Sequence, residues 1–239
     1  MQDTPISPTS LKLRNFVLIW GFAASGTASL VYEVVWQRAL TNTIGSSIYT
    51  TSIIFAAFMA GLALGAHWGG VRLANTPDPV KVFAGLQLGT GAFGIITFYV
   101  INRLQVIYGT VFKLLGHNFQ LFTVAQMALV FLVMLAPTTL MGAAFPVITK
   151  GWSLRVKEVG RSAGDVYSMN TWGSAFGALA AGFILVPLVG LRLTNLSAAL
   201  INLSFGVFGF YVSRVCEPYP DSETAAKRSS PKVLLDARD

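Results

Sequence analysis

Six long apolar segments occupy most of this 239-residue chain. A helix needs roughly 20 apolar residues to cross the hydrocarbon core of a bilayer. Because backbone groups in lipid have no water to bind, each spanning segment is expected to be a helix. The sequence therefore predicts an all-α, multi-pass integral membrane bundle of about six transmembrane helices, at residues 16–40, 48–71, 80–102, 119–148, 164–187 and 192–213.

The composition leaves no room for a sizeable soluble domain beside these spans. Charged residues make up 11% of the chain, whereas soluble domains usually carry about 25%. We expect a cytoplasmic tail at residues 1–14, a membrane domain at 15–214 and a polar cytoplasmic tail at 215–239. The first apolar run continues through Leu30–Trp36, so a retained helix is favoured over a cleaved signal peptide.

The basic residues are distributed unevenly between the two ends of the spans. With the N-terminus inside, every Lys and Arg falls on the cytoplasmic side except Arg38, Arg103, Lys113 and Arg192. This positive-inside bias predicts a protein of the bacterial cytoplasmic membrane with both termini cytoplasmic. It also accounts for the net charge of +7, so membrane lipid, and not nucleic acid, is the expected partner of these charges.

Residues 103–118 differ from the spans on either side. Leu104, Ile107, Val111 and Leu115 recur at helical spacing among polar residues. This pattern predicts an interfacial amphipathic helix on the outer side. The following span contains Pro137, which predicts a kink.

Small residues recur every four positions along three of the spans. Such stripes let helix backbones approach closely in lipid, and they predict a compact bundle. A sliding or rocking interface is the alternative function for these stripes. They comprise Ala57, Gly61, Gly65 and Gly69; Gly85 and Gly89; and Gly173, Gly177 and Ala181.

Two charges, Glu33 and Arg38, lie inside the first apolar segment, where a charge is costly and often functional. They are about 140° apart around a helix, which makes them poor direct partners. One interpretation is an outer ligand site for a cation, with aromatic faces beside the carboxylate. The other is structural, with Glu33 capping a neighbouring helix or paired with Arg192 or Arg38, and Trp36 anchored at the interface. The candidate site residues are Tyr32, Glu33, Trp36, Gln37, Arg38 and Tyr49.

A second polar cluster falls near the inner end of the fifth segment. It could form an inner vestibule or a docking point for a cytoplasmic partner. For Asp165 we favour a structural role, because Ser162-Ala-Gly-Asp165 matches a capping box before an apolar run. The cluster comprises Arg161, Asp165, Tyr167, Asn170 and Ser174.

Metal, cofactor and catalytic sites are not expected from this sequence. His67 and His117 have no partner at metal-ligand spacing. The glycine-rich runs lie within spanning segments, where no phosphate-binding loop is expected. The single cysteine, Cys216, cannot form a disulfide within the chain.

Four stretches of the sequence together resemble one family, the fused spermidine synthase-like membrane proteins. The resemblance is to their transmembrane domain, which those proteins join to a cytoplasmic aminopropyltransferase-type domain. It implies an all-helical membrane fold for nearly all of the apolar part of this chain. The stretches are SGTASLVYEVVWQRAL (25–40), GSSIYTTSIIFAAFMAGLALGAHWGG (45–70), PTTLMGAAFPVITK (137–150) and VGRSAGDVYSMNTWGSAFGALAAGFILVPLVGLR (159–192).

The chain departs from that family after Arg214, because only 25 residues remain and no Rossmann-like synthase domain fits there. The resemblance therefore implies a stand-alone membrane half or a fragment, and no catalytic residue is transferred. There is a weaker likeness to a six-helix half of a major-facilitator transporter. Its signature is incomplete, because the run Gly65–Arg72 lacks the acidic residue expected there.

These features predict a non-catalytic membrane module. It would anchor or scaffold a partner enzyme, or serve as a subunit of a larger membrane complex or a homo-oligomer. The alternative function is a transporter or channel for polyamines or other cations. An enzyme in its own right is the least favoured reading, because the helices lack a recognisable catalytic set.

Overall fold

A computed structural model describes residues 8–46, 48–73, 76–115, 118–156 and 159–216, and these residues are almost entirely helical. The predicted all-α fold with six main helices is confirmed. Two helices carry a short π-helical stretch, named η1 and η2. The elements are α1 (Pro8–Ile44), α2 (Ile48–Trp68), η1 (Gly69–Leu73), α3 (Pro79–Leu115), α4 (Phe119–Val156), α5 (Val159–Leu179), η2 (Ala180–Leu185) and α6 (Val186–Val215).

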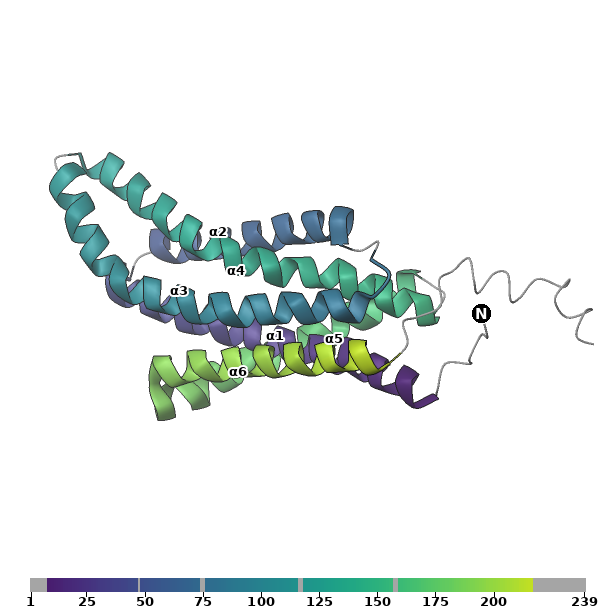
Figure 1. Cartoon of the computed structure of the whole chain (residues 1–239). Helices are drawn as coiled ribbons and strands as arrows, with labels where there is room; N and C mark the ends of the chain where they lie inside the picture. The colour runs from purple at the N-terminus through teal and green to yellow at the C-terminus, as the bar shows by residue number, and fades with distance from the viewer. Residues whose placement is uncertain (1–7, 47, 74–75, 116–117, 157–158, 217–239) are drawn as a thin grey trace, which may run out of the picture.

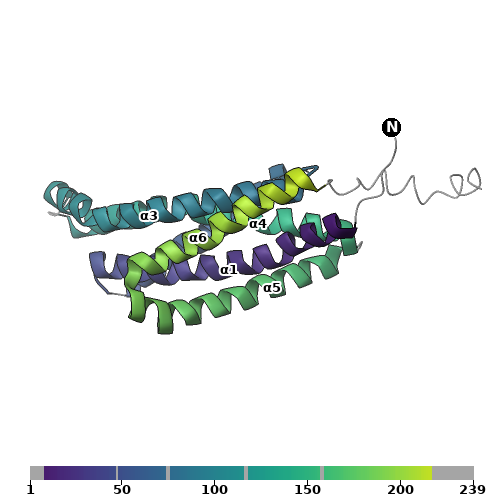
Figure 2. The ribbon, with the colours of Figure 1, turned by 60° about the horizontal axis from the view of Figure 1, so that its bottom comes forward.

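Successive helices run in opposite directions along the bundle (Figures 1 and 2). Gly173 and Gly177 of α5 lie against Ala23 and Thr27 of α1 in the same order, so these two helices are parallel. In α6 the order is reversed, because Asn195 contacts Trp36 while Gly209 lies near Val17. We call the end at which α1 begins and α6 finishes the terminal end, and the opposite end the distal end.

The chain reverses direction at Gly190, which lies near the start of α6. Its backbone has φ 78° and ψ 171°, outside the helical region, and glycine adopts such a positive φ without steric strain. By length and composition, residues 160–215 form one 56-residue apolar helix among five candidate membrane spans. At about 1.5 Å per residue such a helix would be far longer than a bilayer is thick. Because the chain reverses at Gly190, this stretch supplies two of the six predicted spans.

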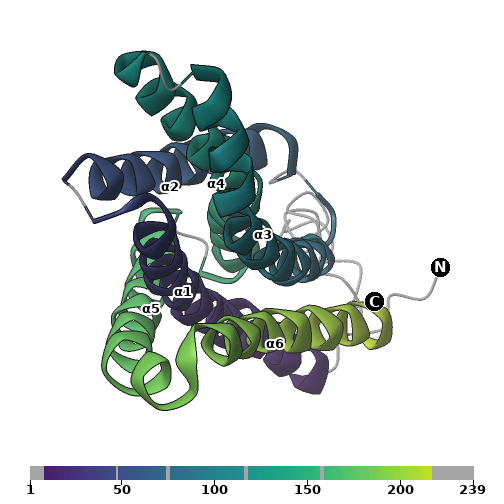
Figure 3. The ribbon, with the colours of Figure 1, turned by 90° about the vertical axis from the view of Figure 1, so that its left-hand side faces the viewer.

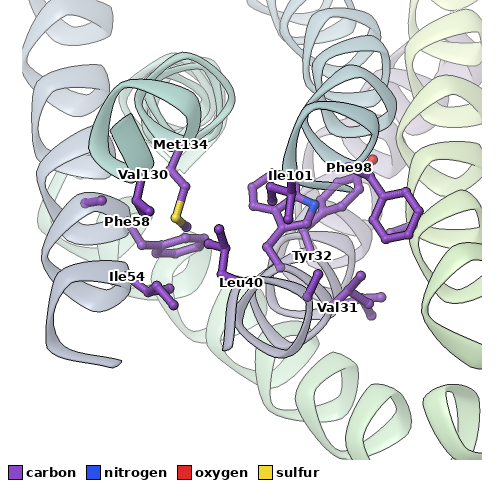
Figure 4. Packing of buried hydrophobic residues seen from close by; sticks show 14 of the residues in the cluster. Val31, Tyr32, Leu40, Ile54, Phe58, Phe98, Ile101, Val130 and Met134 are labelled. Carbon is purple, nitrogen blue, oxygen red and sulfur yellow. The ribbon is translucent and has the colours of Figure 1, made fainter. Parts of the chain in front are cut away.

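Helix α1 lies at the centre and contacts all five other helices. Seen along the bundle, it has α5 on one side, α6 and α3 on another, and α2 with α4 beyond (Figure 3). The most extensive contacts join α2 to α4, α3 to α6 and α1 to α5. Around α1, Leu40 packs with Phe58 and Met134, while Tyr32 packs toward Ile101 of α3 (Figure 4).

The glycine stripes on α2 and α5 pack as predicted. A Cβ atom at Gly65 would overlap the Thr139 carbonyl oxygen of α4, and one at Gly173 would overlap the Ala23 carbonyl oxygen of α1. These pairs of helices therefore touch backbone to backbone. Gly85 differs, because no neighbouring atom lies within 4 Å of its Cβ position.

The predicted helix at residues 103–118 exists through Leu115, but it is not a separate element. It is the C-terminal part of α3, which runs without a break from Pro79. Gly109 lies inside this stretch and does not end the helix, because a lone glycine costs only about 1 kcal/mol relative to alanine. Residues 116–117 lie outside the described part of the chain.

An ion pair closes the terminal end of the bundle. Arg14 of α1 donates to both carboxylate oxygens of Asp78, at 2.8 and 3.3 Å, and to the Cys216 carbonyl oxygen at 2.8 Å. Asp78 also accepts the backbone N–H of Val80 at 3.2 Å, which caps α3. The Arg14 side chain is only 1% exposed, so one buried guanidinium joins the starts of α1 and α3 to the end of α6.

Candidate functional site

Tyr32 and Trp36 form a buried pair on the side of α1 that faces α3 and α6. Their rings are stacked with centroids 5.0 Å apart, as expected for residues four apart on one helix face. The Trp36 indole N–H donates to the Asn195 Oδ1 of α6 at 3.0 Å, and the Tyr32 ring lies beside Gly94 of α3. Trp36 is fully buried, so the predicted role as an interfacial anchor is wrong.

Glu33 lies on a different face from this aromatic pair. Its side chain is 5% exposed, yet the only ion pair among the described residues is the one between Arg14 and Asp78. The expected structural partners, Arg38 and Arg192, are both exposed and do not pair with it.

Of the remaining members of the predicted outer site, Gln37 lies one helical turn from Glu33, whereas Arg38 and Tyr49 lie at exposed positions. Gln37 is half-buried and Arg38 is exposed. Tyr49 is 74% exposed and lines a separate hollow between α2 and α4, beside Thr50 and Gln126. The structure therefore does not gather the six predicted outer residues into one cluster.

The inner cluster is divided in a similar way. Arg161 is exposed, while Asp165 accepts the Trp152 indole N–H of α4 at 3.3 Å. The capping-box prediction is wrong, because α5 begins at Val159 and Ser162 already lies inside the helix. Asp165 instead joins α5 to α4.

Tyr167, Asn170 and Ser174 line a cavity of about 250 Å³. The cavity lies where α1, α2, α4 and α5 meet. Its lining combines phenylalanine side chains with hydroxyl and amide groups, and it contains no charged residue among those described. The remaining lining residues are Phe22, Ser25, Ser29, Leu30, Phe58, Leu62, Ala66, Met141, Gly142 and Phe145.

Glu33 lies on the face of α1 that borders this cavity. Ser29 and Glu33 are four residues apart, and Phe22 precedes Glu33 by eleven residues, or about three turns. All three therefore share one face of the helix, and Phe22 and Ser29 line the cavity. Glu33 lies one turn beyond Ser29 toward the distal end. The three inner residues therefore line the cavity, with Asn170 and Ser174 against Gly26, while Glu33 lies seven residues further along α1.

A buried ladder of amide side chains was missed by the sequence interpretation. Ser25 donates to the Gln87 Oε1 at 3.0 Å, and the Gln87 amide donates to the Asn202 Oδ1 at 3.4 Å. Seven residues before Asn202 on α6, the Asn195 amide donates to the Gly94 carbonyl oxygen at 3.2 Å. The signal was available, because Gln87, Asn195 and Asn202 are strong hydrogen-bonding groups inside apolar spans.

Removing the Asn195 amide should destabilise the bundle. In Asn195→Leu the fully buried Trp36 N–H loses its acceptor, and leaving a buried donor unpaired costs about 1–3 kcal/mol. We expect a loss of that size in the free energy of unfolding, measured by denaturant titration in mixed micelles. Ser204→Leu, at an exposed position on the same helix, is the matched control. An unchanged stability in Asn195→Leu would show that this contact contributes nothing.

Comparison with known proteins gives one distant relative. The chain is 25% identical over 201 residues to a polyamine aminopropyltransferase of Corynebacterium efficiens. The match covers 82% of this chain and 35% of the relative, so the chain spans about a third of that protein's length. Because helices fill most of the chain, the matched residues lie mainly in the membrane bundle.

No protein-family model matches the chain. No solved structure matches it either. The chain is thus a helical, integral membrane protein with distant similarity to an aminopropyltransferase.

Proposed function

We propose that this chain is a non-catalytic membrane module that anchors an aminopropyltransferase-type enzyme domain. The observation that carries the proposal is the match to an aminopropyltransferase in which the matched part is only 35% of the protein. The enzyme domain would be supplied by the same polypeptide or by a separate chain. The helices would then hold the enzyme at the membrane surface.

The terminal end of the bundle is the proposed attachment face, and it would face the cytoplasm. Most of the described basic residues gather there, which the positive-inside rule associates with the cytoplasmic side. They are Lys12, Arg14, Arg72, Lys81, Lys150, Arg161 and Arg214. All but Arg14 keep exposed side chains at this end, so the surface is available to a partner.

Gentle detergent extraction tests the proposal. An affinity-tagged chain, expressed in its native host, should be recovered with an aminopropyltransferase-type enzyme in a fixed stoichiometry. Aminopropyl-transfer activity toward a polyamine should co-purify with the enzyme and be absent from the isolated chain. A preparation without an aminopropyltransferase-type domain, fused or bound, or a bundle that catalyses the transfer without such a domain, would contradict the anchor role.

Paired charge variants locate the attachment face. Lys150→Gln with Arg161→Gln neutralises two exposed residues at the terminal end and should lower the recovery of the enzyme at least several-fold. Arg103→Gln with Lys113→Gln removes the same charge from the distal end and should leave recovery unchanged. Equal recovery from both pairs would contradict docking at the terminal end.

A further inference from the structure

We propose that the cavity between α1, α2, α4 and α5 binds a protonated alkylamine, with the ammonium group beside Glu33 and the alkyl chain among the phenylalanines. This site is independent of the anchor role. It also differs from the outer cation site expected from the sequence, because Tyr32 and Trp36 turn away from it toward α3 and α6.

The first observation is that Glu33 is buried without an ion-pair partner among the described residues. Its side chain is 95% buried within the bundle, and no hydrogen bond or ion pair reaches it from the part of the chain that the structure describes. A buried charge without a partner is strongly destabilising. A cation beside it would therefore stabilise the carboxylate form of Glu33.

The second observation is a cavity that begins one helical turn from Glu33, at Ser29. The cavity of about 250 Å³ is much larger than the roughly 30 Å³ that one water molecule occupies in the liquid. Its lining residue Ser29 is one helical turn from Glu33 on the same face of α1. A ligand that fills the cavity can therefore place one end at the Glu33 carboxyl group.

The third observation is the chemistry of the walls. Ser29, one turn from Glu33, supplies a hydroxyl group that can accept a hydrogen bond from an ammonium group; Asn170 and Ser174 supply further polar groups deeper in the cavity, against Gly26. Phe22 and Phe58 are almost fully buried, so this part of the cavity is apolar and suits methylene groups. Aromatic faces also attract an alkylammonium ion.

Other ligand classes fit these walls less well. An anionic headgroup would be repelled by the carboxylate, and a plain acyl chain would leave the hydroxyl and amide groups unpaired. A bare metal ion needs several oxygen ligands in a closed shell, whereas the described lining supplies no carboxylate and Glu33 lies one helical turn beyond it. An alkylamine suits both parts of the cavity, because its ammonium group can bond to polar side chains and its alkyl chain can pack against the phenylalanines.

Tyr167 of α5 is the exposed member of the cavity lining. Tyr167 is 64% exposed and lines the cavity, while Phe58 is 1% exposed at its interior. A ligand can therefore enter past Tyr167 without passing through the ladder of buried amides between α1, α3 and α6. The anchor contacts at the terminal end are not involved.

Calorimetric titration of the protein in lipid nanodiscs tests the site. The probe is n-butylammonium, and n-butanol is the neutral control of matching shape. We expect saturable binding of n-butylammonium to the wild-type protein, with at least about ten-fold weaker binding of n-butanol, because only the ammonium can pair with the buried carboxylate. Equal binding of the two compounds, or no saturable binding of n-butylammonium, would overturn the proposal.

Matched variants assign the binding to this cavity. Glu33→Gln keeps the shape of the side chain and should weaken n-butylammonium binding at least about ten-fold. Asp165→Asn removes a carboxylate outside the cavity and should bind as the wild type does. Ala66→Phe fills the lining and should abolish binding. The thermal unfolding of each variant is recorded as a folding control. Wild-type binding by a folded Glu33→Gln would overturn the assignment.

Discussion

Replacing Asp78 with Asn should lower the free energy of unfolding by about 3 kcal/mol. Arg14 is 1% exposed and Asp78 is 17% exposed, and removing one partner of a buried ion pair typically costs about 3–5 kcal/mol. The partial exposure of Asp78 places the expected loss at the lower end of that range. Asparagine still caps a helix, so the α3 cap is retained and the measured loss reports the uncompensated Arg14 charge.

Denaturant titration in mixed micelles measures this loss, and two further variants control it. Lys81→Gln removes an exposed charge near the same turn and should change stability by less than about 0.5 kcal/mol. The double variant Arg14→Met with Asp78→Asn removes both charges and should recover much of the loss. If Asp78→Asn is as stable as the wild type, the ion pair does not hold the terminal end together.

Replacing Gly65 with Ala should disrupt the contact between α2 and α4. The added Cβ atom would overlap the Thr139 carbonyl oxygen and lie 2.8 Å from the Ala143 backbone nitrogen. Neither atom can move without shifting the backbone of α4. Overpacking of this kind costs about 1–3 kcal/mol, and we expect a value near the upper end because the helix must move.

Gly85→Ala is the matched control for Gly65→Ala. It makes the same change in an apolar helix, but no atom lies within 4 Å of the new Cβ position. Its stability should be unchanged or raised by up to about 1 kcal/mol, because alanine is the better helix former. Thermal unfolding of both variants in the same detergent makes the comparison. Equal effects of the two substitutions would mean that α2 and α4 do not touch at Gly65.

The sequence was sufficient to predict the spans because apolar length and small-residue spacing are local properties. The stripe at Gly61, Gly65 and Gly69 indicated close packing, and the structure places it against α4. The sequence could not identify the partner helix, since spacing reports the face of a helix and not its neighbour. For the same reason Gly85 looked like part of a stripe although it faces no other helix.

The candidate site was only partly predictable from the sequence. The sequence interpretation grouped Tyr32 and Trp36 with Glu33 in one site, and it could not show that Trp36 donates to Asn195 of α6. The cavity that Asn170 and Ser174 share with Ser29 depends on how α5 lies beside α1, which no local pattern encodes. The Asp165 motif was misleading because the helix begins earlier, at Val159.

The attachment of an enzyme at the terminal end requires that this end faces the cytoplasm and that the chain crosses the membrane six times. Labelling with a membrane-impermeant maleimide in a Cys216→Ser background tests both conditions. Single cysteines are placed by Lys12→Cys and Arg214→Cys at the terminal end, and by Asn42→Cys and Asn118→Cys at the distal end.

In intact cells, we expect the cysteines at positions 42 and 118 to be labelled. Those at positions 12 and 214 should react only after the membrane is permeabilised. Labelling of positions 12 and 214 from opposite sides would mean an odd number of spans and would contradict the reversal at Gly190. Labelling of both from outside would place the terminal end away from the cytoplasm and exclude the proposed anchor role.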